Sequence, residues 1–95
     1  MEKYVKHTDY DRESIVAQFV NELPVLRVGL GLSQAELAER IGISRQTYNS
    51  FENGKKEMPW TTFMALIAVF QNNARTKRML DSIDSIREFL TEFDY

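Results

Sequence analysis

One stretch of the chain decides its fold: residues 34–54, which read QAELAERIGISRQTYNSFENG. Two short segments flank Gly42, and a glycine can adopt the left-handed conformation that ends a helix without steric cost. Ser33, followed three residues later by Glu36, predicts an N-cap with a capping box, and Ser44 predicts a second N-cap. We therefore expect two helices joined by a tight turn.

The two sides of this helix pair differ in polarity. Ala38 is small at the position where two helices must cross closely. The apolar residues that would pack on the rest of the domain are Leu37, Ile41, Ile43, Tyr48 and Phe51. The opposite side of the second helix is polar, and such side chains can bond base edges or phosphates in a DNA major groove. These side chains are Arg45, Gln46, Asn49 and Ser50. The pattern is typical of a DNA-binding helix-turn-helix, and the alternative is an ordinary helical hairpin with polar residues toward solvent.

The remaining sequence also predicts helices. Apolar residues recur at helical spacing from about residue 13 to residue 30, where Pro24 predicts a kink or a division into two helices. Pro59 suits the first turn of another helix. A last helix after Asn73 carries apolar residues at heptad spacing, namely Met79, Ile83, Ile86, Leu90 and Phe93. No alternating apolar pattern predicts a strand, so we expect an all-α fold.

We expect one small domain with three parts. Residues 1–12 have mixed charge and little periodicity, and predict a flexible N-terminal arm. Residues 13–73 contain the helix-turn-helix. Residues 74–95 predict a C-terminal helix that serves as a dimerisation element. Two heptads are too few for a free-standing coiled coil, so this helix either docks on its own domain or pairs with a second copy.

Composition and charge narrow the possible functions. The chain has no cysteine, which excludes disulfides and thiolate chemistry and suits the cytoplasm. No apolar run approaches the roughly 20 residues of a membrane span. The net charge is −2, but residues 27–56 hold five basic and three acidic residues, whereas residues 79–95 hold one basic and five acidic. The acidic end thus lies away from the motif, as suits a DNA-binding surface at the motif. The alternative is that both segments are ordinary solvated faces.

Catalytic and metal-binding patterns are weak. His7, Asp9 and Asp11 alternate in the N-terminal arm, but such residues in a polar arm are more often exposed to solvent than bound to a metal. His7 is the single histidine, and no glycine-rich phosphate loop occurs. We therefore expect no enzymatic activity, no cofactor and no metal.

The sequence resembles the phage repressor and Cro class of helix-turn-helix regulators, the XRE family. Three segments carry the resemblance within about residues 20–70: GLSQAELA at 31–38, GISRQT at 42–47 and ENGK at 52–55. The resemblance implies a five-helix domain, here with an additional C-terminal helical extension, an operator-binding role and usually a homodimer. The chain departs from the family at Trp60, where a polar or basic residue is common.

The resemblance also implies roles for single residues. Arg45, Gln46 and Ser50 match base-reading positions, and Asn49 shares their face. Phosphate contacts are expected from Gln34, Ser44, Asn53, Lys55 and Lys56. Arg27 and Glu52 match a buried ion pair that joins the first helix to the end of the third.

We predict a cytoplasmic, sequence-specific transcriptional regulator, a repressor that binds a palindromic operator as a homodimer with helix 44–53 in the major groove. The alternative is a protein-interaction module, such as an antitoxin-like protein that binds a toxin and for which DNA binding is secondary. The low net charge and the extra C-terminal helix favour this alternative somewhat. The expected partners are double-stranded DNA, a second copy and, in the alternative, a toxin-like protein, with no membrane.

Overall fold

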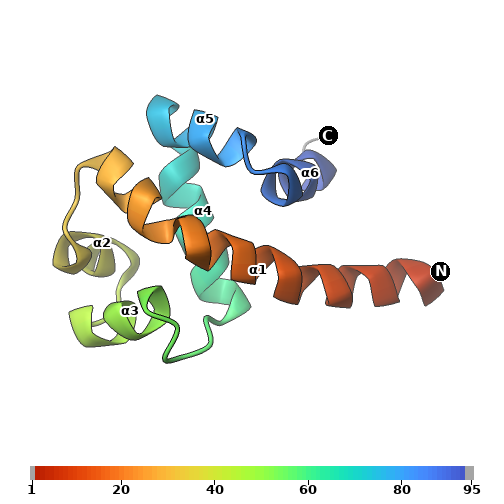
Figure 1. The fold of residues 1–95 in the computed structure, drawn as a ribbon, viewed down its shortest axis with the longest axis horizontal. Helices are drawn as coiled ribbons and strands as arrows, with labels where there is room; N and C mark the ends of the chain where they lie inside the picture. Colours follow the sequence, from red (N-terminus) through yellow and green to blue (C-terminus); the bar gives the residue numbers. More distant parts are fainter. Residues whose placement is uncertain (1, 94–95) are drawn as a thin grey trace.

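The computed structural model describes the backbone of residues 2–93 and the side chains of residues 12–92. Within that part the chain forms six α-helices and no strand, which confirms the predicted all-α fold (Figure 1). The helices are α1 (Glu2–Leu30), α2 (Gln34–Ile41), α3 (Arg45–Glu52), α4 (Trp60–Gln71), α5 (Ala74–Asp81) and α6 (Asp84–Phe93).

Helix α1 is the central element and contacts α3, α4, α5 and α6 (Figure 1). It continues through Pro24 without a break, so the predicted division into two helices is wrong. A proline lacks the N–H of the helical bond, but Leu23 and Leu26 on either side are fully buried and hold the helix on the core.

The start of α1 also differs from the prediction. The helix begins at Glu2 rather than near residue 13, and residues 2–12 contain no glycine or proline that would stop it. The side chains of residues 1–11 lie outside the described part of the chain. The candidate metal ligands His7, Asp9 and Asp11 fall in this segment and stay predictions.

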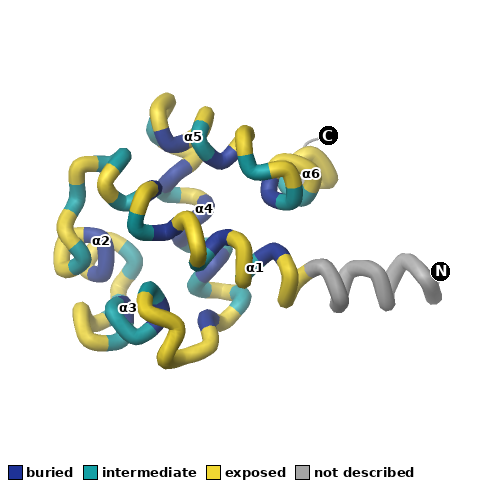
Figure 2. The backbone as a smooth tube through the Cα atoms, in the orientation of Figure 1, coloured by how far each residue is buried: buried dark blue, intermediate teal, exposed yellow. Residues whose placement is uncertain are grey.

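The core forms where α1 crosses α4, and both helices contain buried residues near this crossing (Figure 2). The ring of Phe19 packs edge to face on Phe63 with centroids 5.0 Å apart, and lies 5.9 Å from the ring of Phe70. Such aromatic pairs stabilise beyond the area that they bury. Tyr48 and Phe51 bring α3 onto this core, as the sequence predicted.

The C-terminal segment is two helices instead of the single predicted one. Helix α5 ends at Asp81, where the Ser82 N–H bonds the carbonyls of Arg78 and Met79 and the Ser82 hydroxyl donates to Met79 O at 2.7 Å. A serine that bonds nearby backbone in this way competes with the helical ladder. The predicted continuous heptad seam is therefore interrupted, and α6 takes a new direction (Figure 1).

The residues of that predicted seam pack within their own chain. Ile86 is fully buried, whereas Met79, Ile83 and Leu90 are partly buried against the core. The side chain of Phe93 lies outside the described residues. Within the single chain, the segment docks on α1 and α4, and pairing with a second copy stays a prediction. Ile86 therefore belongs to the core of the domain, and its assignment to a dimer interface is corrected.

Trp60 connects the C-terminal extension to the rest of the domain. Its ring lies 4.8 Å from that of Phe63 and 5.3 Å from that of Phe89 on α6, and the Arg12 guanidinium lies 4.7 Å above it.

Among the described residues, no single helix is long and apolar enough to span a membrane. The segments Arg12–Leu30 and Gln34–Ile41 reach that length and composition only together, across a 99° bend.

Candidate nucleic-acid interface

Local capping holds α2 and the turn after it. The Ser33 hydroxyl accepts a bond from the Glu36 N–H at 3.1 Å, and Glu36 Oε1 accepts one from the Ser33 N–H at 2.8 Å. This reciprocal pair is the predicted capping box. Gly42 ends the helix with φ of +82°, a left-handed conformation that favours glycine.

Helix α3 begins at the second predicted cap. The Ser44 hydroxyl accepts a bond from the Thr47 N–H at 3.0 Å and donates to Thr47 Oγ1 at 2.9 Å. The helix ends at Asn53, followed by Gly54 with φ of +79°. These caps hold α3 with Tyr48 and Phe51 buried and its N-terminal turn exposed.

The predicted ion pair between α1 and the end of α3 is present. Arg27 Nε lies 3.0 Å from Glu52 Oε2 and Nη2 lies 3.2 Å from Oε1, a bidentate arrangement. The side chains are 18% and 7% exposed, respectively. Arg27 also donates to Leu32 O at 3.1 Å, which ties the pair to the loop before α2.

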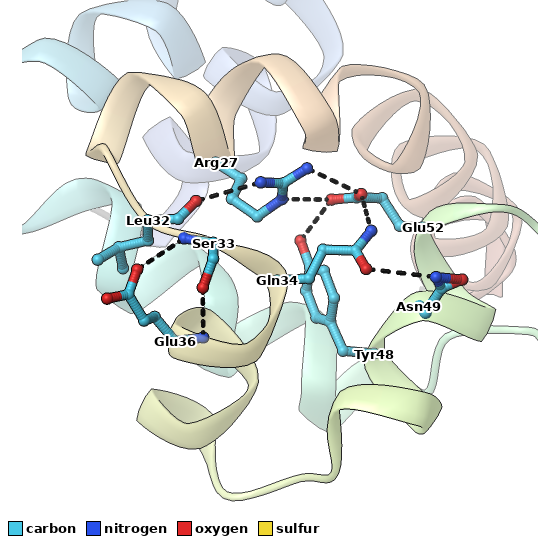
Figure 3. A network of polar contacts seen from close by, with 8 residues as sticks. All are labelled: Arg27, Leu32, Ser33, Gln34, Glu36, Tyr48, Asn49 and Glu52. Carbon is cyan, nitrogen blue, oxygen red and sulfur yellow. Dashed lines mark hydrogen bonds and ion pairs between the residues drawn. The ribbon is translucent and has the colours of Figure 1, made fainter.

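Two further side chains bond the same carboxylate (Figure 3). Tyr48 donates to Glu52 Oε2 at 2.7 Å and Gln34 donates to Oε1 at 2.6 Å. Burial opposes the ionisation of Glu52, but the bonds from Arg27, Tyr48 and Gln34 outweigh it and hold the pKa of this carboxyl below its usual range. Burial and the bond to Glu52 raise the pKa of Tyr48.

Sequence reasoning predicted the Arg27–Glu52 pair but missed Tyr48 and Gln34 as its partners. Tyr48 precedes Glu52 by four residues, a spacing that places both on one side of a helix. That spacing was a usable signal. No comparable signal existed for Gln34, which belongs to another helix.

The four side chains predicted to contact bases fall into two groups. Arg45 and Gln46 are exposed in the first turn of α3. Asn49 and Ser50 are half-buried: Asn49 donates to Gln34 Oε1 at 3.2 Å, and the Ser50 hydroxyl donates to Gln46 O at 3.1 Å. The base contacts of all four stay predictions, but only Arg45 and Gln46 are exposed.

The predicted phosphate contacts are mostly at the surface. The exposed ones are Ser44, Asn53, Lys55 and Lys56. Gln34 is half-buried, because its amide group lies between Glu52 and Asn49 (Figure 3). In the described part of the chain, no group of three or more acidic or histidine side chains is arranged to hold a metal ion.

These features define a helix-turn-helix domain, and comparison with known proteins agrees. Residues 26–71 match the family model described as helix-turn-helix. This match agrees with the resemblance to repressor/Cro-type regulators that the sequence shows. No solved structure matches the chain at a significant level.

Two curated relatives are similar to the chain over 50 residues. Both are called antitoxin HipB, one from Escherichia coli strain K12 and the other from Escherichia coli O6:H1, and each is 36% identical. The matched segment is 53% of this chain and 57% and 53% of the respective relatives. The chain thus spans about half the length of the curated relatives that it matches.

Proposed function

We propose that this chain is a sequence-specific DNA-binding transcriptional regulator that places α3 in a major groove. The observation that carries the proposal is the exposure of Arg45 and Gln46 in the first turn of a helix whose opposite face is buried. The helix-turn-helix match over residues 26–71 supports it. Arginine can bond guanine O6 and N7, and glutamine can bond adenine N6 and N7.

Selection of the full chain against random duplexes tests this proposal. The selected duplex and a shuffled duplex of the same composition are then titrated at several salt concentrations. We expect a preference of about 10³-fold or more for the selected sequence at physiological salt. Equal retention of all duplexes, or no retention at low salt, would contradict the proposed function.

We further propose that the regulator acts in the cytoplasm as a homodimeric repressor on a palindromic operator. A two-fold dimer doubles the number of base pairs read, with half-sites about one helical turn apart, roughly 10 base pairs. Light scattering of the full chain tests the dimer directly. A monomer at high micromolar concentration would rule it out.

A second candidate is an antitoxin-like role in which the chain binds a toxin-like protein. The similarity to two proteins called antitoxin HipB favours it. Both relatives are matched over only about half of their length. Purification of the chain from its native cell distinguishes the candidates: a stoichiometric protein partner supports this role, and salt-sensitive retention of DNA alone supports the regulator.

A further inference from the structure

Four hydrogen bonds run in one direction along an edge of α3. The Lys55 N–H donates to Asn53 Oδ1 at 3.0 Å, and Asn53 Nδ2 donates to Asn49 Oδ1 at 2.9 Å. Asn49 Nδ2 donates to Gln34 Oε1 at 3.2 Å, and Gln34 Nε2 donates to Glu52 Oε1 at 2.6 Å (Figure 3). We call Gln34, Asn49 and Asn53 the amide chain, because each accepts on one side and donates on the other.

The two ends of the amide chain determine its direction. The backbone N–H of Lys55 can only donate, and an ionised carboxylate such as Glu52 can only accept. Glu52 is held ionised by the two bonds from Arg27. If any one amide were flipped, two carbonyl oxygens or two NH₂ groups would face each other. The Glu52 carboxylate at one end and the Lys55 N–H at the other therefore require the same orientation of the exposed Asn53 side chain.

What the amide chain leaves available is a row of donors. Each side-chain amide has two N–H bonds, and the hydrogen bonds of the amide chain use one N–H of each of the three amides. Lys55 and Lys56 follow directly and are exposed. Neutral N–H donors beside two ammonium groups suit an anionic acceptor, and the phosphate oxygens of DNA are contacted by such side chains.

The same bonds disfavour base reading by Asn49. A bidentate contact to adenine requires the carbonyl oxygen and the NH₂ group of an asparagine together. In this structure Asn49 Oδ1 already accepts from Asn53, and Nδ2 already donates to Gln34. A contact to a phosphate needs only the remaining N–H, which the amide chain leaves unused.

We propose that Asn49 joins Gln34 and Asn53 in binding DNA phosphates, and that Glu52 is a positioning residue that sets the orientation of the amide chain through Gln34. The proposal rests on the DNA-binding function proposed above. It assigns Asn49 to the DNA backbone, in place of the base contact predicted from the sequence.

Asn49→Ala in the full chain tests the assignment of Asn49. We expect binding to weaken about 3–10-fold, as for the loss of one neutral hydrogen bond, and equally on the selected and shuffled duplexes. The slope of log K against log salt should stay unchanged, because a neutral amide releases no counterion. Fluorescence anisotropy of a labelled duplex over a range of salt concentrations measures all three quantities.

Two control variants make this pattern specific. Lys55→Ala should lower the salt slope by about one and leave base preference unchanged, because it removes a charge near the phosphates. Arg45→Ala should relax the preference at one or two base positions. If Asn49→Ala also relaxes base preference, or leaves binding unchanged, the assignment to the DNA backbone is wrong while the proposed function stands. If the unaltered chain binds no duplex, the proposed function itself fails.

The positioning role of Glu52 has a spectroscopic test that does not depend on DNA. Glu52→Gln replaces an acceptor by a group that can also donate, so we expect the side-chain NH₂ resonances of Asn49 and Asn53 to shift in the NMR spectrum. The NH₂ resonances of Asn21 and Asn72, outside the amide chain, should not move. Gln34→Ala breaks the amide chain next to Glu52, so it should also shift the side-chain NH₂ resonances of Asn53. This variant replaces Glu52→Gln in the test if Glu52→Gln does not fold. If the side-chain NH₂ resonances of Asn53 are unchanged in the variant tested, the positioning role of Glu52 is wrong.

Discussion

A single carboxylate joins three of the helices around the turn. Glu52, at the end of α3, accepts bonds from Arg27 of α1, Gln34 of α2 and Tyr48 of α3 itself. Bonds that involve an ionised group are stronger than neutral ones, and more so where water is scarce. Glu52 therefore contributes, together with the buried Tyr48 and Phe51, to the orientation of α3 relative to α1 and α2.

Glu52→Gln should lower the free energy of unfolding by roughly 3 kcal/mol, because removal of one charge leaves Arg27 largely buried without its partner. Urea unfolding followed by circular dichroism measures the change. Glu39→Gln is the matched control, since Glu39 is exposed on α2 and outside the network. Equal stability of the two variants would contradict a structural role for the pair.

The stability that Glu52 contributes should depend on pH with a definite sign. Because its folded-state pKa is lowered, the contribution is complete above the unfolded value of about 4.3 and is lost as the pH falls through the folded pKa. The stability difference between the unaltered chain and Glu52→Gln should therefore shrink below about pH 4. Unfolding by urea at a series of pH values from neutral to strongly acidic tests this, and a difference independent of pH would refute it.

Arg45→Ala should weaken binding to the selected operator by about 1–3 kcal/mol and relax the preference at one or two base positions. The reason is the exposed position of Arg45 in the first turn of α3, where a bidentate guanine contact is sterically open. Competition titrations with operators altered at each base pair measure the effect. A loss of equal size on specific and shuffled DNA would show that Arg45 binds phosphate instead.

At the scale of elements, α1 and α5 lie close together at Gly29. A Cβ built on Gly29 would lie 2.9 Å from Met79 Sδ and 3.2 Å from Thr76 Cγ2. Thr76 is fully buried and donates its hydroxyl to Phe70 O at 2.5 Å, which leaves it little freedom to move. The absence of a side chain at Gly29 thus permits the C-terminal extension to dock on α1.

Gly29→Val should displace α5 from α1, because its branched side chain meets the immobile Thr76 as well as Met79. We expect a loss of about 1–3 kcal/mol, typical of an overpacked contact, and faster hydrogen exchange in α5. Gly29→Ala is the comparison variant: its Cβ meets the same two side chains but carries no further branch, and alanine favours a helix by about 1 kcal/mol over glycine, so we expect a smaller loss. Equal stability of the valine and alanine variants would contradict the close crossing.

At the scale of the whole molecule, the two ends of the chain stabilise the helix-turn-helix from outside the family match at residues 26–71. The part of α1 before residue 26 supplies Ile15 and Phe19 to the core, and the C-terminal extension supplies Leu80 and Ile86. The C-terminal extension gives a structural reason for a tryptophan at position 60, because the Trp60 ring contacts Phe89 on α6.

A chain that ends at Asn73 should therefore be strongly destabilised, because removal of α5 and α6 exposes Trp60 and leaves the sites of Leu80 and Ile86 empty. Thermal unfolding of the truncated chain should begin at a lower temperature, and the emission of Trp60 should shift to the red before unfolding. A truncated chain as stable as the full one would contradict this. Because the truncated chain would lose stability for this reason, a loss of dimerisation after truncation would not locate the interface. The dimer is therefore tested on the full chain.

The sequence by itself determined the elements that depend on a few neighbouring residues. The capping box at Ser33, the left-handed Gly42 and the cap at Ser44 are local, since each requires contacts only three or four residues away. The inward face of α3 and the Arg27–Glu52 pair were likewise readable, from helical spacing and from the family pattern, respectively.

Only the tertiary structure decided the rest. The heptad spacing of the C-terminal segment predicted one helix, but packing of Leu80 and Ile86 on α1 and α4 accompanies a break at Ser82. The polar face of α3 predicted the same base-contacting role for Asn49 and Arg45. In the structure Asn49 donates to Gln34 of another helix, whereas Arg45 is exposed. Periodicity specifies which side of a helix is polar, whereas the partner of each polar side chain depends on residues that only folding brings within hydrogen-bond distance.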